Sequence, residues 1–437
     1  MENLQIPLIQ QADLKGKVVL VRVDHNVVKN GVIHDPYRID ATIGTLFHII
    51  SKGGKIILMT HVGRPKDKKT GEITISDKTA IQPIVDYLQQ KLHITLKVPE
   101  FFAREKQGYL GVETSVNHLI RELKEGLIDG IYLPNTRWFS GEEAKGEEAD
   151  RFANQLAGLA DIFINDAFGS WQAHASTVQV SQYLPSYAGF LMQKEITNLE
   201  RIYQPESPFL AVVAGSKFDT KIDSLFALLE KADYLVLGGV IYNAYLCAKY
   251  NFTIKGIEAD DMEHALEFVK FAKKYKHKII ELPYIIESDT MEGKLKGKNR
   301  LRNIAEIKAG TALNYVLDIA KESFLEKNVI KVFHQAQTIF VNAVMGYTPF
   351  FNEGTIALDE LIDSNVNAIK LYGGGDTMQE LKRLLPGLYI SALDSPNYYI
   401  FTGGGAVLKA IENGTTTGLA PVKALIVSGE KNKQHKL

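Results

Sequence analysis

Short, continuous apolar runs recur along this chain, and segments with helical periodicity separate them. Runs of this kind are typical of strands buried on both faces of a parallel sheet, and their alternation with helices indicates βαβ units. The expected strands are Val18–Val23, Lys55–Thr60, Gly130–Leu133, Asp161–Ile164, Phe209–Val213, Tyr234–Leu237, Lys278–Leu282, Thr338–Val341, Ala368–Tyr372 and Tyr398–Phe401. The pattern therefore predicts an α/β protein built on doubly wound parallel sheets.

The chain has 437 residues, which exceeds what one hydrophobic core normally supports, so we expect two domains of about 200 residues each. A break at Leu184-Pro185 precedes a segment from Tyr187 to Tyr203 that has the pattern of one helix. This helix is expected to join the two halves.

Apolar residues that recur every three or four positions predict the helices between the strands. One helix is expected from Thr42 to Lys52, with an apolar face made of Ile43, Leu46, Phe47, Ile49 and Ile50. Another is expected after Thr220, where the buried residues would be Ile222, Leu225, Phe226 and Leu229. The polar stretch from Ser288 to Asn303 is expected to be a solvated loop.

Charge and cysteine content limit the function classes. The 50 basic and 51 acidic residues nearly cancel, which argues against nucleic acid or an anionic membrane as the main partner. The single cysteine, Cys247, excludes an intramolecular disulfide and fits a reducing compartment. The first residues lack the pattern of a secretory leader, and no apolar run reaches membrane-spanning length. We therefore expect a soluble, cytoplasmic protein.

A glycine turn, Gly373-Gly374-Gly375, lies between an expected strand and an amphipathic segment. Glycines leave backbone N–H groups open to a ligand at the positive end of a helix, where a phosphate fits. Asp376 would repel that phosphate unless a cation lies between them, and Mg²⁺ held by one carboxylate and phosphate oxygens is the usual solution. The alternative is a tight strand-to-helix turn in which Asp376 or Thr377 merely caps the helix.

In open α/β sheets, ligands bind outside the carboxyl ends of the strands, so the residues after each strand are candidates for chemistry. In the first half these are Asp24-His25-Asn26, His61-Val62-Gly63-Arg64, Asn135-Thr136-Arg137 and Asn165 to Gly169, with Arg22 and Arg38 nearby. This set indicates a clamp for a small phosphorylated carboxylate. The alternative is that each arginine forms only a surface salt bridge.

The corresponding segments of the second half are rich in glycine and are expected to bind phosphate. They are Gly215-Ser216-Lys217, Gly238-Gly239, Asn342-Ala343, Gly373 to Thr377 and Thr402 to Gly405. Lys217 and Lys221 stand four residues apart, so they can reach one anion from one helix start, unless they are only part of a solvated face. Neither a P-loop nor a G-x-G-x-x-G motif occurs, which argues against a P-loop NTPase and a typical dinucleotide dehydrogenase.

Taken in order, these motifs resemble the phosphoglycerate kinase family over nearly the whole chain. The resemblance rests on Val21 to Asn26, Arg38-Ile39, Thr60 to Pro65, Asn165 to Gly169, Ala173 to Ser176, Ala188 to Met192, Lys217 with Lys221, Gly373 to Thr377 and Thr402 to Ala406. It implies two doubly wound, Rossmann-like domains that face each other across a cleft. Residues 1–186 would bind 3-phosphoglycerate, 187–203 would form the interdomain helix, 204–413 would bind nucleotide, and the tail 414–437 would return to the first domain.

The resemblance also implies an activity, phosphoryl transfer from 1,3-bisphosphoglycerate to MgADP by hinge closure of a monomer. The implied substrate-binding residues are Asp24, Asn26, Arg38, His61, Arg64 and Arg137. The implied nucleotide-binding residues are Lys217, Gly238, Gly239, Asn342, Gly373, Gly374, Gly375, Asp376, Thr377, Gly403 and Gly404. Arg38 and Lys221 would stabilise the phosphoryl group in flight, and Asp376 would hold Mg²⁺.

Several positions depart from the family pattern. His25 stands where the family has phenylalanine, Gln172 replaces a basic-patch arginine, and Val240 replaces a glycine. The segment Val341 to Pro349 places a proline where the family has a glutamate that binds the ribose hydroxyls, and Glu353 is a candidate substitute. The alternatives to an active kinase are therefore an impaired paralogue with a binding or regulatory role, or a kinase that prefers another nucleotide or acyl phosphate.

Overall fold

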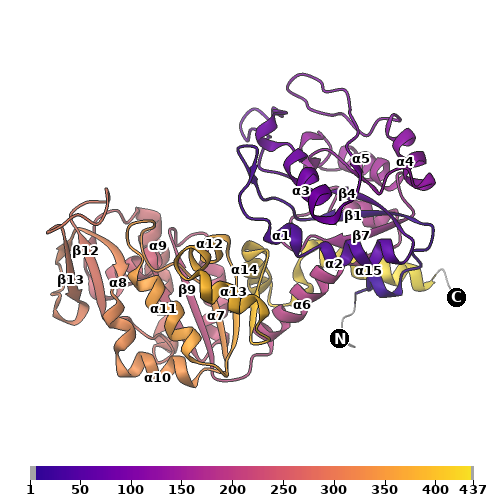
Figure 1. Ribbon diagram of the computed structural model, residues 1–437. Helices are drawn as coiled ribbons and strands as arrows, with labels where there is room; N and C mark the ends of the chain where they lie inside the picture. Colours follow the sequence, from indigo (N-terminus) through magenta and orange to yellow (C-terminus); the bar gives the residue numbers. More distant parts are fainter. Residues whose placement is uncertain (1–5, 435–437) are drawn as a thin grey trace. The chain divides into compact units, whose positions relative to one another are not determined.

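The computed structural model describes residues 6–434, apart from the side chains of 432–434 (Figure 1). It divides into two compact units. Unit 1 contains the described residues up to Thr197 and from Thr417 onward, and unit 2 runs from Asn198 to Thr416. The boundary at Thr197 falls inside helix α6 (Phe190–Tyr203), which starts after the short strand β8 (Ser186–Ala188). Helix α15 (Ala420–Gln434) belongs to unit 1, where Ser428 lies 3.5 Å from the carbonyl of Leu184.

Unit 1 is built on a six-stranded parallel sheet with the order β5-β6-β4-β1-β7-β8. Its strands are β1 (Val18–Val23), β4 (Lys55–Met59), β5 (Leu96–Lys97), β6 (Gly130–Tyr132), β7 (Ile162–Asp166) and β8, and a small hairpin joins β2 (Val28–Lys29) to β3 (Val32–Ile33). Its other helices are α1 (Tyr37–Asp40), α2 (Ile43–Ser51), α3 (Gln82–Leu92), α4 (Val116–Glu125) and α5 (Glu147–Ala157).

Successive side chains along each strand of unit 1 point to opposite faces of the sheet, and each face carries an apolar core. Leu20 and its same-face neighbours pack with residues of α4 and α5. Val21 and its neighbours pack with residues of α2 and α3 on the opposite face. Because both faces are covered by helices, the expectation of a doubly wound sheet is confirmed.

Unit 2 is built on a five-stranded parallel sheet with the order β10-β9-β16-β17-β18. Its strands are β9 (Phe209–Gly215), β10 (Tyr234–Gly238), β16 (Thr338–Asn342), β17 (Ile369–Tyr372) and β18 (Tyr398–Ile400). Its helices are α7 (Ile222–Lys231), α8 (Gly239–Tyr250), α9 (Ala259–Ala272), α10 (Lys327–Gln335), α11 (Glu353–Ser364), α12 (Gly375–Leu384), α13 (Pro386–Asp394) and α14 (Gly404–Asn413). Two small sheets accompany it. One pairs β11 (Thr253–Ile254) with β14 (Ala312–Leu313), and the other is antiparallel with the order β13 (Asn299–Asn303), β12 (Tyr284–Ser288), β15 (Tyr315–Ile319).

Nine of the expected strands are present with ends within two residues of those predicted, and the tenth is wrong. At Lys278–Leu282, only a single bridge from Ile279 to Leu235 forms. Lys278 turns its ammonium toward the carbonyls of Leu229 and Glu230, and Pro283 has no N–H to continue a ladder. The apolar run is therefore a buried connection and not a strand.

The expected loop at Ser288 to Asn303 is also wrong, because its ends form strands β12 (Tyr284–Ser288) and β13 (Asn299–Asn303), paired antiparallel. Arg300 and Arg302 of β13 donate to the buried Glu287 of β12 at 2.6–2.8 Å. Burial acts to raise the pKa of Glu287, but these arginines and the N–H of Asn314 lower it to about 2. Charges that favoured a solvated loop in the sequence thus pair across two strands.

The expected helix faces are correct in part. In α2, Leu46 and Ile49 are buried, but Phe47 is 72% exposed and Ile50 41% exposed. In α7, Ile222, Leu225 and Leu229 are buried and Phe226 is half-buried. Within residues 6–434, no helix is both long enough and apolar enough to cross a membrane.

Candidate functional site

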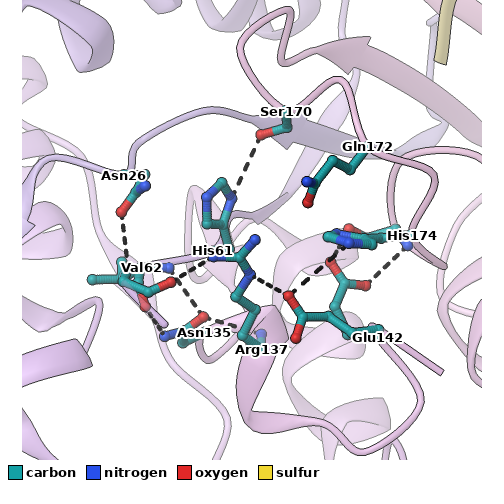
Figure 2. Close-up of polar contacts among 12 residues, drawn as sticks. Asn26, His61, Val62, Asn135, Arg137, Glu142, Ser170, Gln172 and His174 are labelled. Carbon is teal, nitrogen blue, oxygen red and sulfur yellow. Dashed lines mark hydrogen bonds and ion pairs between the residues drawn. The ribbon is translucent and has the colours of Figure 1, made fainter. Parts of the chain in front are cut away.

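The expected substrate-binding residues of unit 1 lie after strands β1, β4 and β6, at the same edge of the sheet. Figure 2 shows Asn26, His61 and Arg137 among the hydrogen bonds of this edge. Asn26 accepts a bond from the N–H of Gly63 at 2.9 Å. Asn135 accepts from the N–H of Val62 at 3.0 Å and donates to its carbonyl at 2.8 Å. These side chains hold the segment after β4, which carries His61 and Arg64. We call this group the unit 1 site.

His61 is held as a neutral ring. The guanidinium of Arg22 can only donate, and it lies 3.0 Å from His61 Nδ1, so this nitrogen accepts and Nε2 carries the proton. Ser170 Oγ lies 3.5 Å from the same nitrogen. Burial and then the charge of Arg22 lower the pKa of His61 well below its ordinary value. The ring can therefore donate one hydrogen bond from Nε2 without carrying charge.

Arg22, which holds His61, is itself fully buried and depends on Glu142. Arg22 Nε donates to Ser176 Oγ at 2.9 Å, and that hydroxyl donates to Glu142 Oε1 at 2.6 Å. Burial lowers the pKa of Arg22, and the negative charge of Glu142 opposes this effect. Glu142 was not predicted from the sequence, where only its position soon after Arg137 could have drawn attention to it.

The remaining cationic residues of the unit 1 site differ in exposure. Arg137 donates to the carbonyl of Gly63 at 2.6 Å and pairs with Glu143 at 2.9 Å. Arg38 lies on α1 and donates to Asp24 Oδ2 at 3.3 Å. Asp24 Oδ1 is buried and accepts no hydrogen bond within the described chain, so it can accept one from a ligand hydroxyl. Arg64 and Gln172 are exposed, and the backbone oxygen of Gln172 accepts from Thr177 Oγ1 at 2.7 Å.

His25, the first departure from the family pattern, is fully buried and satisfied by hydrogen bonds. Its Nε2 lies 2.9 Å from Thr42 Oγ1 and its Nδ1 lies 3.0 Å from the hydroxyl of Tyr132. Thr42 in turn donates to the carbonyl of Ile39 at 2.8 Å, next to Arg38 on α1. Burial and then Arg22 lower the pKa of His25 to about 3, so the ring is neutral.

His25→Phe is expected to destabilise unit 1 by about 2 kcal/mol, because two buried hydroxyls each lose a partner. Urea unfolding followed by tryptophan fluorescence measures this effect, since both tryptophans, Trp138 and Trp171, lie in unit 1. His34→Phe is the matched control, because His34 is exposed. Equal midpoints for the two variants would contradict the expectation.

Unit 2 contains a cavity of about 610 Å³ outside the carboxyl ends of its parallel strands. The predicted residues that line it are Lys221, Gly239, Asn342, Gly374, Gly375, Asp376, Thr377 and Gly404. The predicted residues that do not line it are Lys217, Gly238, Gly373 and Gly403. We call this cavity the unit 2 pocket.

Two glycine turns meet at one end of the unit 2 pocket. Gly374 has a φ of +122°, a region that side chains rarely adopt, and it precedes helix α12. A Cβ on Gly404, at the start of α14, would lie 2.3 Å from the Cα of Gly374. The two helices therefore begin side by side over bare backbone, and both point their N-terminal N–H groups at this end of the pocket.

Lys221 reaches the same end from the start of α7. Its ammonium donates to the carbonyl of Ala214 and to Asn342 Oδ1 at 2.5 Å. Asn342 donates to the carbonyl of Gly373 at 2.7 Å, so the lysine is tied to the glycine turn. Burial lowers the pKa of Lys221 to about 8, and the nearby Asp376 opposes the shift. A bound phosphate can replace these neutral oxygens as the acceptor of the Lys221 ammonium.

Asp376 lies exposed in the first turn of α12 and lines the pocket, while Thr377 is buried. Among residues 6–434, no group of three His, Cys, Asp or Glu side chains could cage a metal. In a typical Mg²⁺–nucleotide site, however, the protein supplies only one carboxylate ligand beside a phosphate-binding turn, and phosphate oxygens complete the coordination. The residues present fit such an ion.

The unit 2 pocket also carries other departures from the family pattern. Val240 lines it, together with Val344 to Thr348, whereas Pro349 does not. Glu353 does not line it either, because its carboxylate pairs with Lys294 at 2.6 Å. The position of Glu353 therefore does not favour it as a replacement for the family's ribose-binding glutamate. Asp318, which sequence reasoning missed, also lines the pocket. It is almost fully buried, and burial raises its pKa to about 7.

Comparisons with known proteins agree with this geometry. The sequence model of the family described as phosphoglycerate kinase matches residues 9–414. The chain is 33% identical to the phosphoglycerate kinase of Dictyoglomus turgidum over 420 residues, covering 94% of this chain and 97% of the relative. It is 34% identical to that of Desulforudis audaxviator over 420 residues, covering 94% and 98%.

The fold also matches a solved structure along its whole length. The structure of phosphoglycerate kinase from Coxiella burnetii superposes with a TM-score of 0.75 at 27% identity, covering 98% of this chain and all of that one. Because the family model and these relatives span nearly the whole sequence, local motifs alone do not carry the assignment. The chain belongs to the phosphoglycerate kinase family.

Proposed function

We propose that this chain catalyses the reversible transfer of a phosphoryl group from 1,3-bisphosphoglycerate to MgADP, giving 3-phosphoglycerate and ATP. The observation that carries the proposal is the position of Lys221, which lines a glycine-rich pocket together with Asp376. Phosphoryl transfer needs positioning and neutralisation of charge more than covalent help, and a lysine beside a metal-binding carboxylate supplies both.

The unit 1 site would bind the glycerate and its phosphate. Asp24 Oδ1, the buried oxygen without a partner, would accept a hydrogen bond from the hydroxyl of the substrate. His61 Nε2 would donate to a carboxylate or phosphate oxygen without adding charge. Arg38, Arg64 and Arg137 would supply positive charge, with Asn26 holding the segment after β4.

The unit 2 pocket would bind the nucleotide, with its phosphates at the glycine turns and the start of α12. Asp376 would hold Mg²⁺, which supplies charge neutralisation between the nucleotide phosphates and the carboxylate. Lys217 is exposed on the loop before α7 and would reach the phosphates from the side of the pocket. The base would lie beside Val240 and the segment Val344 to Thr348, which also line the pocket.

Donor and acceptor would bind to different units, so transfer requires that the units close over them. Arg38 of unit 1 and Lys221 of unit 2 would then face the same moving phosphoryl group and balance its charge. Closure also excludes water from an acyl phosphate that is prone to hydrolysis. The reducing environment of the cytoplasm suits the single cysteine, which is buried.

Consumption of ATP that depends on 3-phosphoglycerate tests the proposed function directly. We expect turnover with Mg²⁺ present, and loss of turnover in Asp376→Asn. No turnover, together with no MgADP binding by calorimetry, would overturn the proposal. Turnover with GTP but not ATP would retain the reaction and locate a change of preference at the proposed position of the base, next to Val240.

The proposal also predicts how nucleotide efficiency depends on pH. Only the charged form of Lys221 attracts phosphate, and this form is lost as pH rises through its pKa of about 8. The kcat/KM for MgADP, which reports the free enzyme, is expected to be constant below pH 8 and to fall about tenfold per pH unit above it. Lys221→Arg should abolish this fall, because arginine stays charged. A flat wild-type profile up to pH 9.5 would contradict the assignment.

A further inference from the structure

The loop between β9 and α7 carries Lys217 and Lys221, and a side chain from outside the pocket holds it. Asp261, in the first turn of α9, accepts a hydrogen bond from the backbone N–H of Phe218 at 2.6 Å. Asp261 is 6% exposed and Phe218 is not exposed. A short bond from a buried carboxylate to a backbone N–H is a strong constraint on the loop.

The carbonyl of the same residue, Phe218, leads directly to Lys221. The carbonyl of Phe218 accepts a hydrogen bond from the N–H of Lys221 at 3.0 Å. Lys221 in turn accepts from the N–H of Leu225 through its own carbonyl at 2.9 Å, which starts helix α7. A continuous path of hydrogen bonds therefore runs from Asp261 through Phe218 to the backbone of Lys221.

A second contact fixes the loop to the same helix. The ring of Phe218 packs against Phe268 of α9, with 5.8 Å between ring centroids, and Phe268 is fully buried. Helix α9 thus holds Phe218 by its backbone and by its side chain. Asp261 does not line the unit 2 pocket, and among the described residues it pairs with neither lysine. Its influence on a bound phosphate would therefore be indirect.

We propose that Asp261 is a positioning residue for phosphoryl transfer, which sets the location of Lys221 and Lys217 by holding the backbone of Phe218. This inference rests on the proposed function. Reacting groups must be held within about an ångström, because a misplacement of that size can cost about 100-fold in rate. A loop anchored at one peptide between its two lysines would meet this requirement, and a loop released from α9 would not.

The test compares Asp261→Ala and Asp261→Asn with Asp260→Ala. Asp260 is the neighbouring residue of the same first turn and is exposed, so its variant controls for loss of a negative charge at the start of α9. Asp261→Ala is expected to raise KM for MgADP about tenfold and to lower kcat about 10- to 100-fold. Asp261→Asn keeps an oxygen acceptor and is expected to stay within about threefold of wild type. Asp260→Ala is expected to match wild type.

A purely structural role of Asp261 would change the amount of folded protein and would leave kcat, KM and the pH profile of the folded protein unchanged. Asp261→Ala should leave KM for 3-phosphoglycerate unchanged and should displace the fall of kcat/KM for MgADP from its position near pH 8, because Lys221 leaves its site. Equal kcat, KM and pH profile for Asp261→Ala and wild type, normalised to folded protein, would overturn the inference. If Asp261→Ala does not fold, Asp261→Leu, which also lacks an acceptor but keeps more of the buried volume, takes its place. Loss of the pH 8 inflection in Asp261→Leu supports the inference, and an unchanged profile overturns it. An inactive wild type would overturn the proposed function itself.

Discussion

Lys221→Ala is expected to lower kcat by about 100- to 1,000-fold, the usual effect of removing one preorganised charge that stabilises a transition state. The ammonium lies among neutral oxygens, Ala214 O and Asn342 Oδ1, at the end of the pocket where two helices begin. With alanine at this position, the remaining lysine of the described pocket lining is Lys255, whose ammonium lies 4.7 Å over the ring of Tyr315. The developing charge would then be balanced only by Mg²⁺ and by unit 1.

Steady-state kinetics at saturating substrates measures this loss, and Lys231→Ala is the control. Lys231 ends the same helix, α7, and lies over the ring of Tyr203 at 5.3 Å, away from the pocket lining. Lys221→Arg should recover part of kcat, because charge is kept and geometry is not. A kcat for Lys221→Ala within threefold of wild type, with only KM for MgADP raised, would mean that the lysine binds the ground state alone.

Most of the fold was predictable because strand signals in a parallel sheet are local. Val18–Val23 is apolar at all but one position, and the structure buries every residue of it, including Arg22. Prediction from local sequence failed where a residue pairs with others that are distant in the sequence. The carboxylate of Glu287 is paired by Arg300, which lies opposite it, and by Arg302, two positions along the same strand, whereas polarity alone predicts a loop there.

The candidate site was predictable to a similar extent. The rule that ligands bind at the carboxyl ends of strands led to His61, Asn342 and Asp376, which the structure places at such ends. The rule says nothing of residues that act from behind the site. Asp261 is 43 positions from Phe218 and Glu142 is 34 from Ser176, so no sequence spacing relates either carboxylate to its partner.

The second large effect concerns stability and is expected for Glu142→Leu. Arg22 is buried and always charged. Its positive charge is balanced chiefly by Glu142, to which it is connected through Ser176 Oγ. Removing one partner of a buried charge costs about 3–5 kcal/mol, because the remaining charge stays out of water without compensation. A leucine fills much of the glutamate volume, so the loss would come from charge and hydrogen bonding and not from a cavity.

Urea unfolding of unit 1, followed by the fluorescence of Trp138 and Trp171, measures this cost. Glu148→Leu, at an exposed position of α5, controls for removal of a carboxylate near the site and is expected to lie within about 0.5 kcal/mol of wild type. Glu142→Gln should fall between the two, since an amide oxygen can still accept from Ser176. If Glu142→Leu unfolds at the wild-type midpoint, Arg22 is compensated by another group. Asp24 is then the candidate, because it is the other acid that favours the charge of Arg22, and the carboxylate that binds substrate would also stabilise the fold.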